Sequence, residues 1–132
     1  MTIKNTLTSI VVAGTLALGV TGCKYSSHNQ YTYDGMIGQD SVKFEIKEYP
    51  ISSNTNTITV KKPNGVIVSY IDVYNDDLKL EYLKITKNGK TTSYSSDDAV
   101  GKPVVAEGQK QFDNYLTQIL EIKINEGLNN LK

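Results

Sequence analysis

The chain has 132 residues, and its 14 basic residues, all lysine, balance 14 acidic ones, so the formal net charge is zero. Proteins that bind nucleic acid usually carry a strong basic excess and use arginine forks on phosphate and guanine, so we expect no nucleic-acid partner. A single cysteine excludes an internal disulfide and any zinc or iron–sulfur site built on several cysteines, and no cofactor is expected.

The N-terminal segment has the layout of an export signal. Lys4 lies near its start, an apolar run extends over residues 10–20, and the stretch Val20-Thr21-Gly22-Cys23 closes it. A membrane-spanning helix needs about twenty apolar residues, so this run is too short and matches the apolar region of a signal peptide. An ordinary secretory signal followed by a chance cysteine is the alternative.

Residues 1–23 resemble the signal of prokaryotic lipoproteins, in which small residues precede an obligatory cysteine. The resemblance implies cleavage between Gly22 and Cys23 and attachment of lipid, including palmitate, to Cys23. It also implies anchoring at the cell membrane or the outer membrane, with the domain outside the cytoplasm. We therefore expect a signal peptide at 1–22, a lipidated cysteine and flexible tether at 23–30, which contains the sole histidine, and a single globular domain at 31–132.

The domain begins with the pattern of a β-hairpin. Alternation of apolar and polar residues predicts strands at 31–37 and 40–49, joined by a turn at Gly38-Gln39 with glycine in the first turn position. In this register Asp34 lies opposite Lys43. Residues 52–56 are polar and are expected to form a loop.

Two further hairpins are predicted at Asn-Gly pairs. Asn64-Gly65 favours a type I′ turn, which places Val68 and Tyr70 on the face opposite to Ile58 and Val60. Asn88-Gly89 joins a strand at 78–87 to the following one. The recurrence of Asn-Gly-x-x-x-Ser-Tyr 24 residues apart indicates either an internal duplication or two hairpins that obey the same steric rules.

The C-terminal part has helical periodicity from about Val104. One apolar stripe contains Phe112, Tyr115, Leu116, Ile119 and Ile122, while Gln109 and other polar residues lie largely opposite it. The expected fold is therefore α+β: an antiparallel β-meander of about six strands, with one C-terminal amphipathic helix packed on one face.

No catalytic set is evident, because the one cysteine belongs to the signal and the one histidine to the tether. The pairs Asp76-Asp77 and Asp97-Asp98 could serve a hydrolase, but aspartate is also favoured in turns for local backbone hydrogen bonds. Calcium is a weak alternative for Asp72, Asp76 and Asp77, since their spacing does not match an EF-hand loop.

A sheet face remains as the candidate binding site. A three-residue turn at 75–77 would place Tyr70 opposite Tyr82 and Val68 opposite Lys84. Tyrosines bordered by lysines suit protein recognition, although solvated strands often carry the same residues. The candidate face therefore consists of Tyr70, Tyr82, Lys61, Lys84 and Val68.

These features favour a membrane-anchored, non-catalytic lipoprotein that binds another envelope or extracellular protein. Two alternatives stay open: an envelope hydrolase that uses the turn carboxylates, and a purely structural envelope component.

Overall fold

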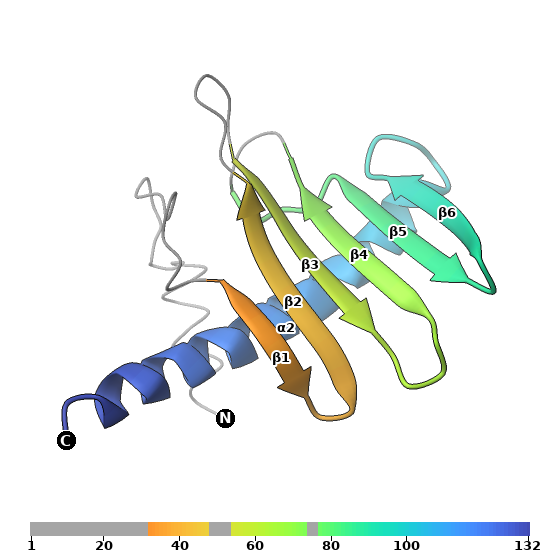
Figure 1. The fold of residues 1–132 in the computed structure, drawn as a ribbon. Helices are drawn as coiled ribbons and strands as arrows, with labels where there is room; N and C mark the ends of the chain where they lie inside the picture. Colours follow the sequence, from red (N-terminus) through yellow and green to blue (C-terminus); the bar gives the residue numbers. More distant parts are fainter. Residues whose placement is uncertain (1–31, 48–53, 74–76) are drawn as a thin grey trace. The chain divides into compact units, whose positions relative to one another are not determined.

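The computed structural model of the chain describes residues 32–47, 54–73 and 77–132. These residues form six strands and one long C-terminal helix, an α+β fold (Figure 1), and the predicted fold class is confirmed. Cys23, His28 and the strand end predicted at residue 49 lie outside the described residues. The elements are β1 (Tyr33–Ile37), β2 (Asp40–Lys47), β3 (Thr55–Lys61), β4 (Ile67–Asp72), β5 (Tyr82–Lys87), β6 (Lys90–Ser95) and α2 (Gly101–Asn129).

The six strands form one open antiparallel sheet in the order of the sequence. Each strand pairs with the next one along the chain, so each pairing is closed by a short or moderate connection. The first hairpin has the predicted register, with Asp34 opposite Lys43. Its turn has Gly38 at φ +62°, a conformation that glycine adopts without steric cost.

The turn between β3 and β4 differs from the prediction. The amide of Gly65 donates to the carbonyl of Lys62 over 2.9 Å, the amide of Lys62 donates to the carbonyl of Val66 over 2.9 Å, and Gly65 has φ +89°. Asn64 has no positive φ, so this is a type I turn followed by a glycine bulge, not the type I′ turn. The cause is Pro63. A type I′ turn at Asn64-Gly65 needs a hydrogen bond from the backbone N–H of residue 63, which proline lacks, whereas the fixed φ of proline suits the second position of a type I turn.

The bulge moves the register by one residue and reverses the predicted face of β4. Val60 lies opposite Val68, and Ile58 lies opposite Tyr70. Val68 and Tyr70 therefore share a face with the core residues of β3. The predicted placement of Val68 and Tyr70 on the other face is wrong.

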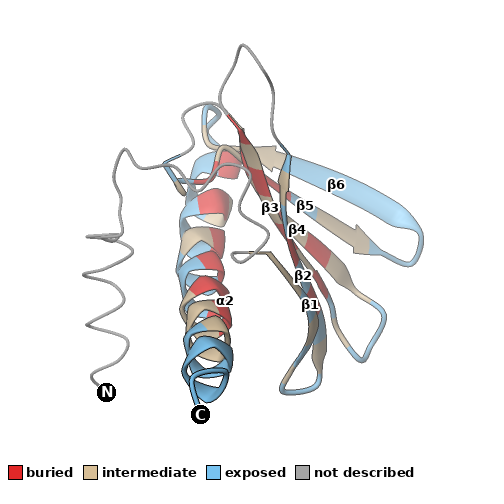
Figure 2. Cartoon of the chain, turned by 60° about the vertical axis from the view of Figure 1, so that its left-hand side comes forward, coloured by how far each residue is buried: buried red, intermediate tan, exposed pale blue. Residues whose placement is uncertain are grey.

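We call the face of the sheet that carries these residues the inner face, and the opposite one the outer face. A row of cross-strand neighbours runs across the inner face, and all its members are buried: Phe44, Ile58, Tyr70 and Leu83. Burial of one such side chain contributes about 1.5–3 kcal/mol. Figure 2 shows the buried residues of the central strands in red and the exposed edge strand β6 in pale blue.

The first turns of α2 pack on the inner face. Gly108 lies so close to Leu83 that a Cβ on this glycine would be 3.1 Å from a leucine methyl group. Phe112 meets Tyr70 with ring centroids 6.4 Å apart. The helix begins at Gly101, three residues before the predicted start, because Asp98 caps it: its Oδ1 accepts the amide of Gly101 over 2.5 Å.

The chain divides into two compact units, Thr32–Phe112 and a second one made of Met1–Tyr31 with Asp113–Lys132. The sheet and the first turns of α2 belong to the first unit. The described residues of the second unit are the remainder of α2 and the last residues of the chain. There the predicted apolar stripe is buried at Tyr115, Leu116 and Ile119. The single domain predicted over 31–132 stays a prediction.

Candidate functional site

The face predicted to bind a partner is divided between the two sides of the sheet. Tyr70 and Val68 lie on the inner face and are 0 % and 7 % exposed. Tyr82, Lys61 and Lys84 lie on the outer face. In place of the predicted opposition of Tyr70 and Tyr82, the sheet pairs Tyr70 with Leu83. The five residues therefore do not form one surface, and the prediction of a common binding face is wrong.

The second register error comes from the connection between β4 and β5. Strand β5 begins at Tyr82, not at residue 78, so the connection is longer than a three-residue turn. The side chain of Gln109 binds the backbone of this connection: its Oε1 accepts a hydrogen bond from the amide of Leu80 over 2.8 Å, and its Nε2 donates one to the carbonyl of Leu78 over 2.9 Å. Periodicity assigned Gln109 to the polar side of the helix, so this role was missed.

The outer face of the three strands β3–β5 carries apolar side chains interspersed with lysines. We call it the Tyr82 surface; Ile71 lies directly opposite Tyr82, Ile67 opposite Lys61, and Ser69 opposite Lys84. Tyr82 and both isoleucines are half-buried by their neighbours, and the two lysines are exposed. The Tyr82 surface consists of Lys61, Ile67, Ser69, Ile71, Tyr82 and Lys84.

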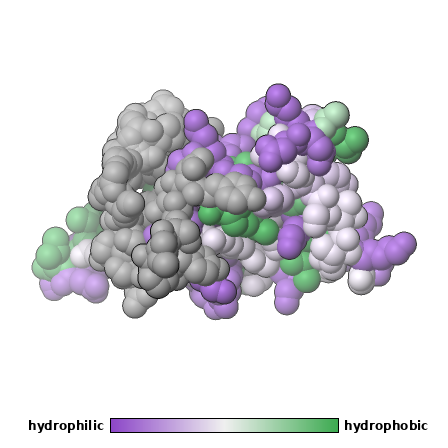
Figure 3. Space-filling model, turned by 90° about the horizontal axis from the view of Figure 1, so that it is seen from above, coloured by the Kyte–Doolittle hydropathy of each residue, from purple (hydrophilic) through white to green (hydrophobic). Residues whose placement is uncertain are grey.

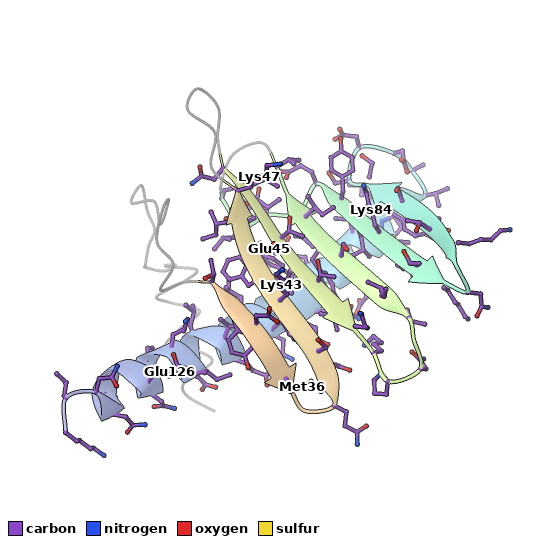
Figure 4. All side chains as sticks on the ribbon, in the orientation of Figure 1. Met36, Lys43, Glu45, Lys47, Lys84 and Glu126 are labelled. Atoms are coloured by element: carbon purple, nitrogen blue, oxygen red, sulfur yellow. The ribbon has the colours of Figure 1, made fainter. Side chains whose placement is uncertain are left out.

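The charges of the outer face differ between its two sides. On β2 the ammonium of Lys43 lies 3.5 Å from Glu45, and Asp34 of β1 lies opposite the same lysine. Figure 4 shows Lys43 and Glu45 following each other along β2, with Lys84 on β5. All outer positions of β3–β5 are described, and they carry lysine but no carboxylate, so this part of the face is positive.

A cluster of carboxylates lies where β4 ends and β5 begins. Ligand atoms of Asp72, Asp77 and Glu81 lie within 4.8 Å of one another. The structure thus brings together two of the three predicted calcium candidates, whereas Asp76 lies outside the described residues. Figure 3 looks onto the end of the sheet at which β4 finishes, where the residues coloured by hydropathy include both hydrophilic (purple) and hydrophobic (green) ones.

Hydrogen bonds hold one oxygen of each carboxylate in this cluster. Oδ2 of Asp72 accepts from Nδ2 of Asn56 over 2.9 Å and from the amide of Leu78 over 2.8 Å. The amide of Lys79 donates to Asp77 over 2.9 Å, and the amide of Val73 donates to Glu81 over 2.7 Å. Leu78 has φ +63°, a conformation uncommon for leucine.

Asp72 is the buried member of the cluster, and it is 0 % exposed. Its Oδ1 accepts no hydrogen bond from the residues that the structure describes. Burial raises the pKa of the Asp72 carboxyl to about 7; the bonds from Asn56 and Leu78 oppose this rise, and the charges of Glu81 and Asp77 add to it.

Glu81 and Asn56 were missed as partners of Asp72. Asn56, assigned to a loop, lies buried in β3 opposite Asp72. The alternation of Val68, Tyr70 and Asp72 along one strand was the available signal, because it places the acid on the same face as two apolar residues. By contrast, the local role predicted for the turn aspartates is confirmed at Asp98, which caps α2.

Comparison with known protein families, curated proteins and solved structures gives no match for this chain. None of the helices in the described part of the chain has the length and apolar character that a membrane crossing requires. Function is therefore inferred from two features, the Tyr82 surface and the carboxylate cluster.

Proposed function

We propose that the chain is a membrane-anchored, non-catalytic lipoprotein that binds another protein of the envelope or an extracellular protein through the Tyr82 surface. One observation carries the proposal: half-buried Ile71 and Tyr82 lie directly opposite each other on the outer face, and exposed Lys84 and Lys61 lie one and two residue pairs further along the same face. Protein interfaces combine apolar and aromatic contacts of this kind with polar neighbours. Tyrosine also supplies contact area at low conformational cost.

The charge of the surface indicates the chemistry of the partner. Lys61 and Lys84 have no carboxylate within 4.0 Å among the described residues. Complementary potentials speed association and select partners. The partner we propose therefore presents acidic side chains around an apolar contact.

The test is quantitative cross-linking in cells that carry the full, lipidated chain. Tyr82→Ala, and Lys61→Glu combined with Lys84→Glu, should each reduce the yield of the cross-linked partner at least tenfold, because the first removes the aromatic contact and the second reverses the charge of the lysines. Lys102→Glu reverses an exposed charge at the start of α2 and serves as the matched control, with an unchanged yield. Partners that are cross-linked equally by all variants would exclude the Tyr82 surface.

The two alternative functions make different demands. A hydrolase needs its acid within hydrogen-bond reach of the substrate, whereas Asp77 and Asp98 each accept a hydrogen bond from a nearby backbone amide, Lys79 and Gly101 respectively, the local role typical of turn aspartates. A purely structural component needs no specific partner, so it would give no cross-link that depends on Tyr82.

A further inference from the structure

We propose that Asp72, Asp77 and Glu81 form a binding site for a divalent cation that prefers oxygen ligands, namely Ca2+. The three carboxylates come from the end of β4, the connection and the residue before β5. Their ligand atoms lie within 4.8 Å of one another. Two oxygens bound to one calcium ion at about 2.4 Å can be up to about 4.8 Å apart, so the cluster has the dimensions of a calcium site.

The carboxylates are held in place and keep oxygens for an ion. Backbone amides of Leu78, Lys79 and Val73 bind one oxygen each on Asp72, Asp77 and Glu81 respectively. Among the described residues, no backbone amide binds the second oxygen of these carboxylates. An ion would therefore find ligands that are already oriented, which lowers the cost of ordering them.

A separate observation points to a ligand at this place. Oδ1 of Asp72 is buried, and none of the described residues donates a hydrogen bond to it. Buried polar atoms are nearly always paired, and an exception suggests an ion or water. In the described part of the chain, the salt bridges join other residues, so no lysine neutralises Asp72, Asp77 or Glu81. One cation would satisfy the orphaned oxygen and balance the three charges.

The donor set selects calcium among common cations. It contains only carboxylate oxygens, which suit hard ions and not zinc or copper. The burial of the ligands increases from exposed Asp77 through half-buried Glu81 to buried Asp72. The ion could therefore complete its shell with water at the Asp77 side. Calcium tolerates such irregular shells of six to eight oxygens, whereas magnesium requires a near-ideal octahedron.

The experiment uses the full chain in detergent, stripped of metal with EDTA. Thermal unfolding is followed by circular dichroism during titration with CaCl2, and calorimetry gives the dissociation constant. We expect a Kd of about 0.1–1 mM, the range of exported calcium modules, and a Tm raised by about 5 °C or more at ~10 mM CaCl2. No shift with CaCl2, or an equal shift with MgCl2 or NaCl of the same ionic strength, overturns the proposal.

Two variants locate the ion. Asp77→Asn and Glu81→Gln each keep an oxygen for the backbone amide, and neither residue is fully buried, so both variants should fold. Each should weaken calcium binding at least tenfold. Asp97→Asn removes an exposed acid outside the cluster and should leave the shift intact. A calcium shift that persists in both cluster variants places the ion elsewhere and overturns the assignment.

Discussion

Asp72 ends β4 at a position that the alternation of the strand assigns to the inner face. Its backbone lies opposite that of Asn56, and the side-chain amide of Asn56 donates a hydrogen bond to it. An ionised carboxylate at such a place loses most of its hydration, and only part of this cost is recovered by two hydrogen bonds. The protonation state of this one residue therefore affects the stability of the whole fold.

In calcium-free solution we expect the free energy of unfolding to decrease as the pH rises from about 4 to about 7. The folded state has a pKa of about 7 at Asp72, whereas the ordinary value is 3.8, so in this window the folded chain holds a proton that the unfolded chain has lost. The upper limit of the effect is about 4 kcal/mol. Urea unfolding at several pH values measures it.

Asp72→Asn is the variant that checks this assignment, because it keeps the size of the side chain and removes its titration. The slope between about pH 4 and 7 should become flat in this variant. Asp97→Asn should leave the slope as in the wild type. Equal slopes in the wild type and Asp72→Asn would show that other groups, such as Glu81 or Asp77, cause the pH dependence.

Two tyrosines show why the predicted binding face was wrong at the level of single residues. Tyr70 and Tyr82 lie on neighbouring strands, yet Tyr70 is buried and donates to Gln111 over 2.8 Å, and Tyr82 lies on the outer face. A shift of one residue in register reverses the face of every side chain in a strand. The shift at Tyr70 follows from Pro63 in the preceding turn and not from the tyrosines themselves.

At the scale of elements, the two Asn-Gly hairpins have different turns. Asn88 and Gly89 both have positive φ, 53° and 77°, which is the type I′ turn that the dipeptide favours. Asn64 occupies a position with negative φ in the type I turn, and only Gly65 is left-handed. The shared dipeptide therefore does not give a structural repeat, and Pro63 accounts for the difference.

Alanine substitutions should separate the two turns. Asn88→Ala places alanine at positive φ and should cost about 1–2 kcal/mol. Asn64→Ala loses the bond that its Oδ1 accepts from the amide of Val66 over 3.0 Å, an exposed contact worth about 0.5–1 kcal/mol. Asn88→Gly should be close to neutral. Denaturant midpoints measure all three, and a larger loss at Asn64 than at Asn88 would contradict the assignment of the turns.

The elements themselves were largely predictable because they depend on local rules. Alternation and turn dipeptides indicated the meander, and the helical stripe identified Phe112, Leu116 and Ile119 as buried. The exact pairing depended on one turn residue and one long-range contact. Pro63 set the bulge, and Gln109 bound the connection before β5 from a helix 29 residues further along.

At the scale of the whole molecule, the inner face of the sheet carries the buried core residues, and the outer face is the one for which we propose a role in recognition. The first turns of α2 cover part of the inner face, while Ile71 and Tyr82 on the outer face are only half-buried. The expected tether of residues 23–30 has eight residues, and eight extended residues span at most about 25–30 Å. A partner reached through this tether would therefore lie close to the membrane.

Anchoring is predicted to depend on Cys23 alone. Cys23→Ser should abolish labelling with palmitate and leave an unlipidated precursor, because the sequence contains no other cysteine to receive the lipid. Folding should be unaffected: the carboxylates of the cluster come from residues 72–81, so the Tm and its calcium shift should match those of the wild type. Palmitate labelling that survives the substitution would contradict the lipobox assignment. If Cys23→Ser loses both the palmitate label and the calcium-induced shift in Tm, the stability of the domain depends on the anchor. A lower cross-linking yield in this variant would then be an effect on folding.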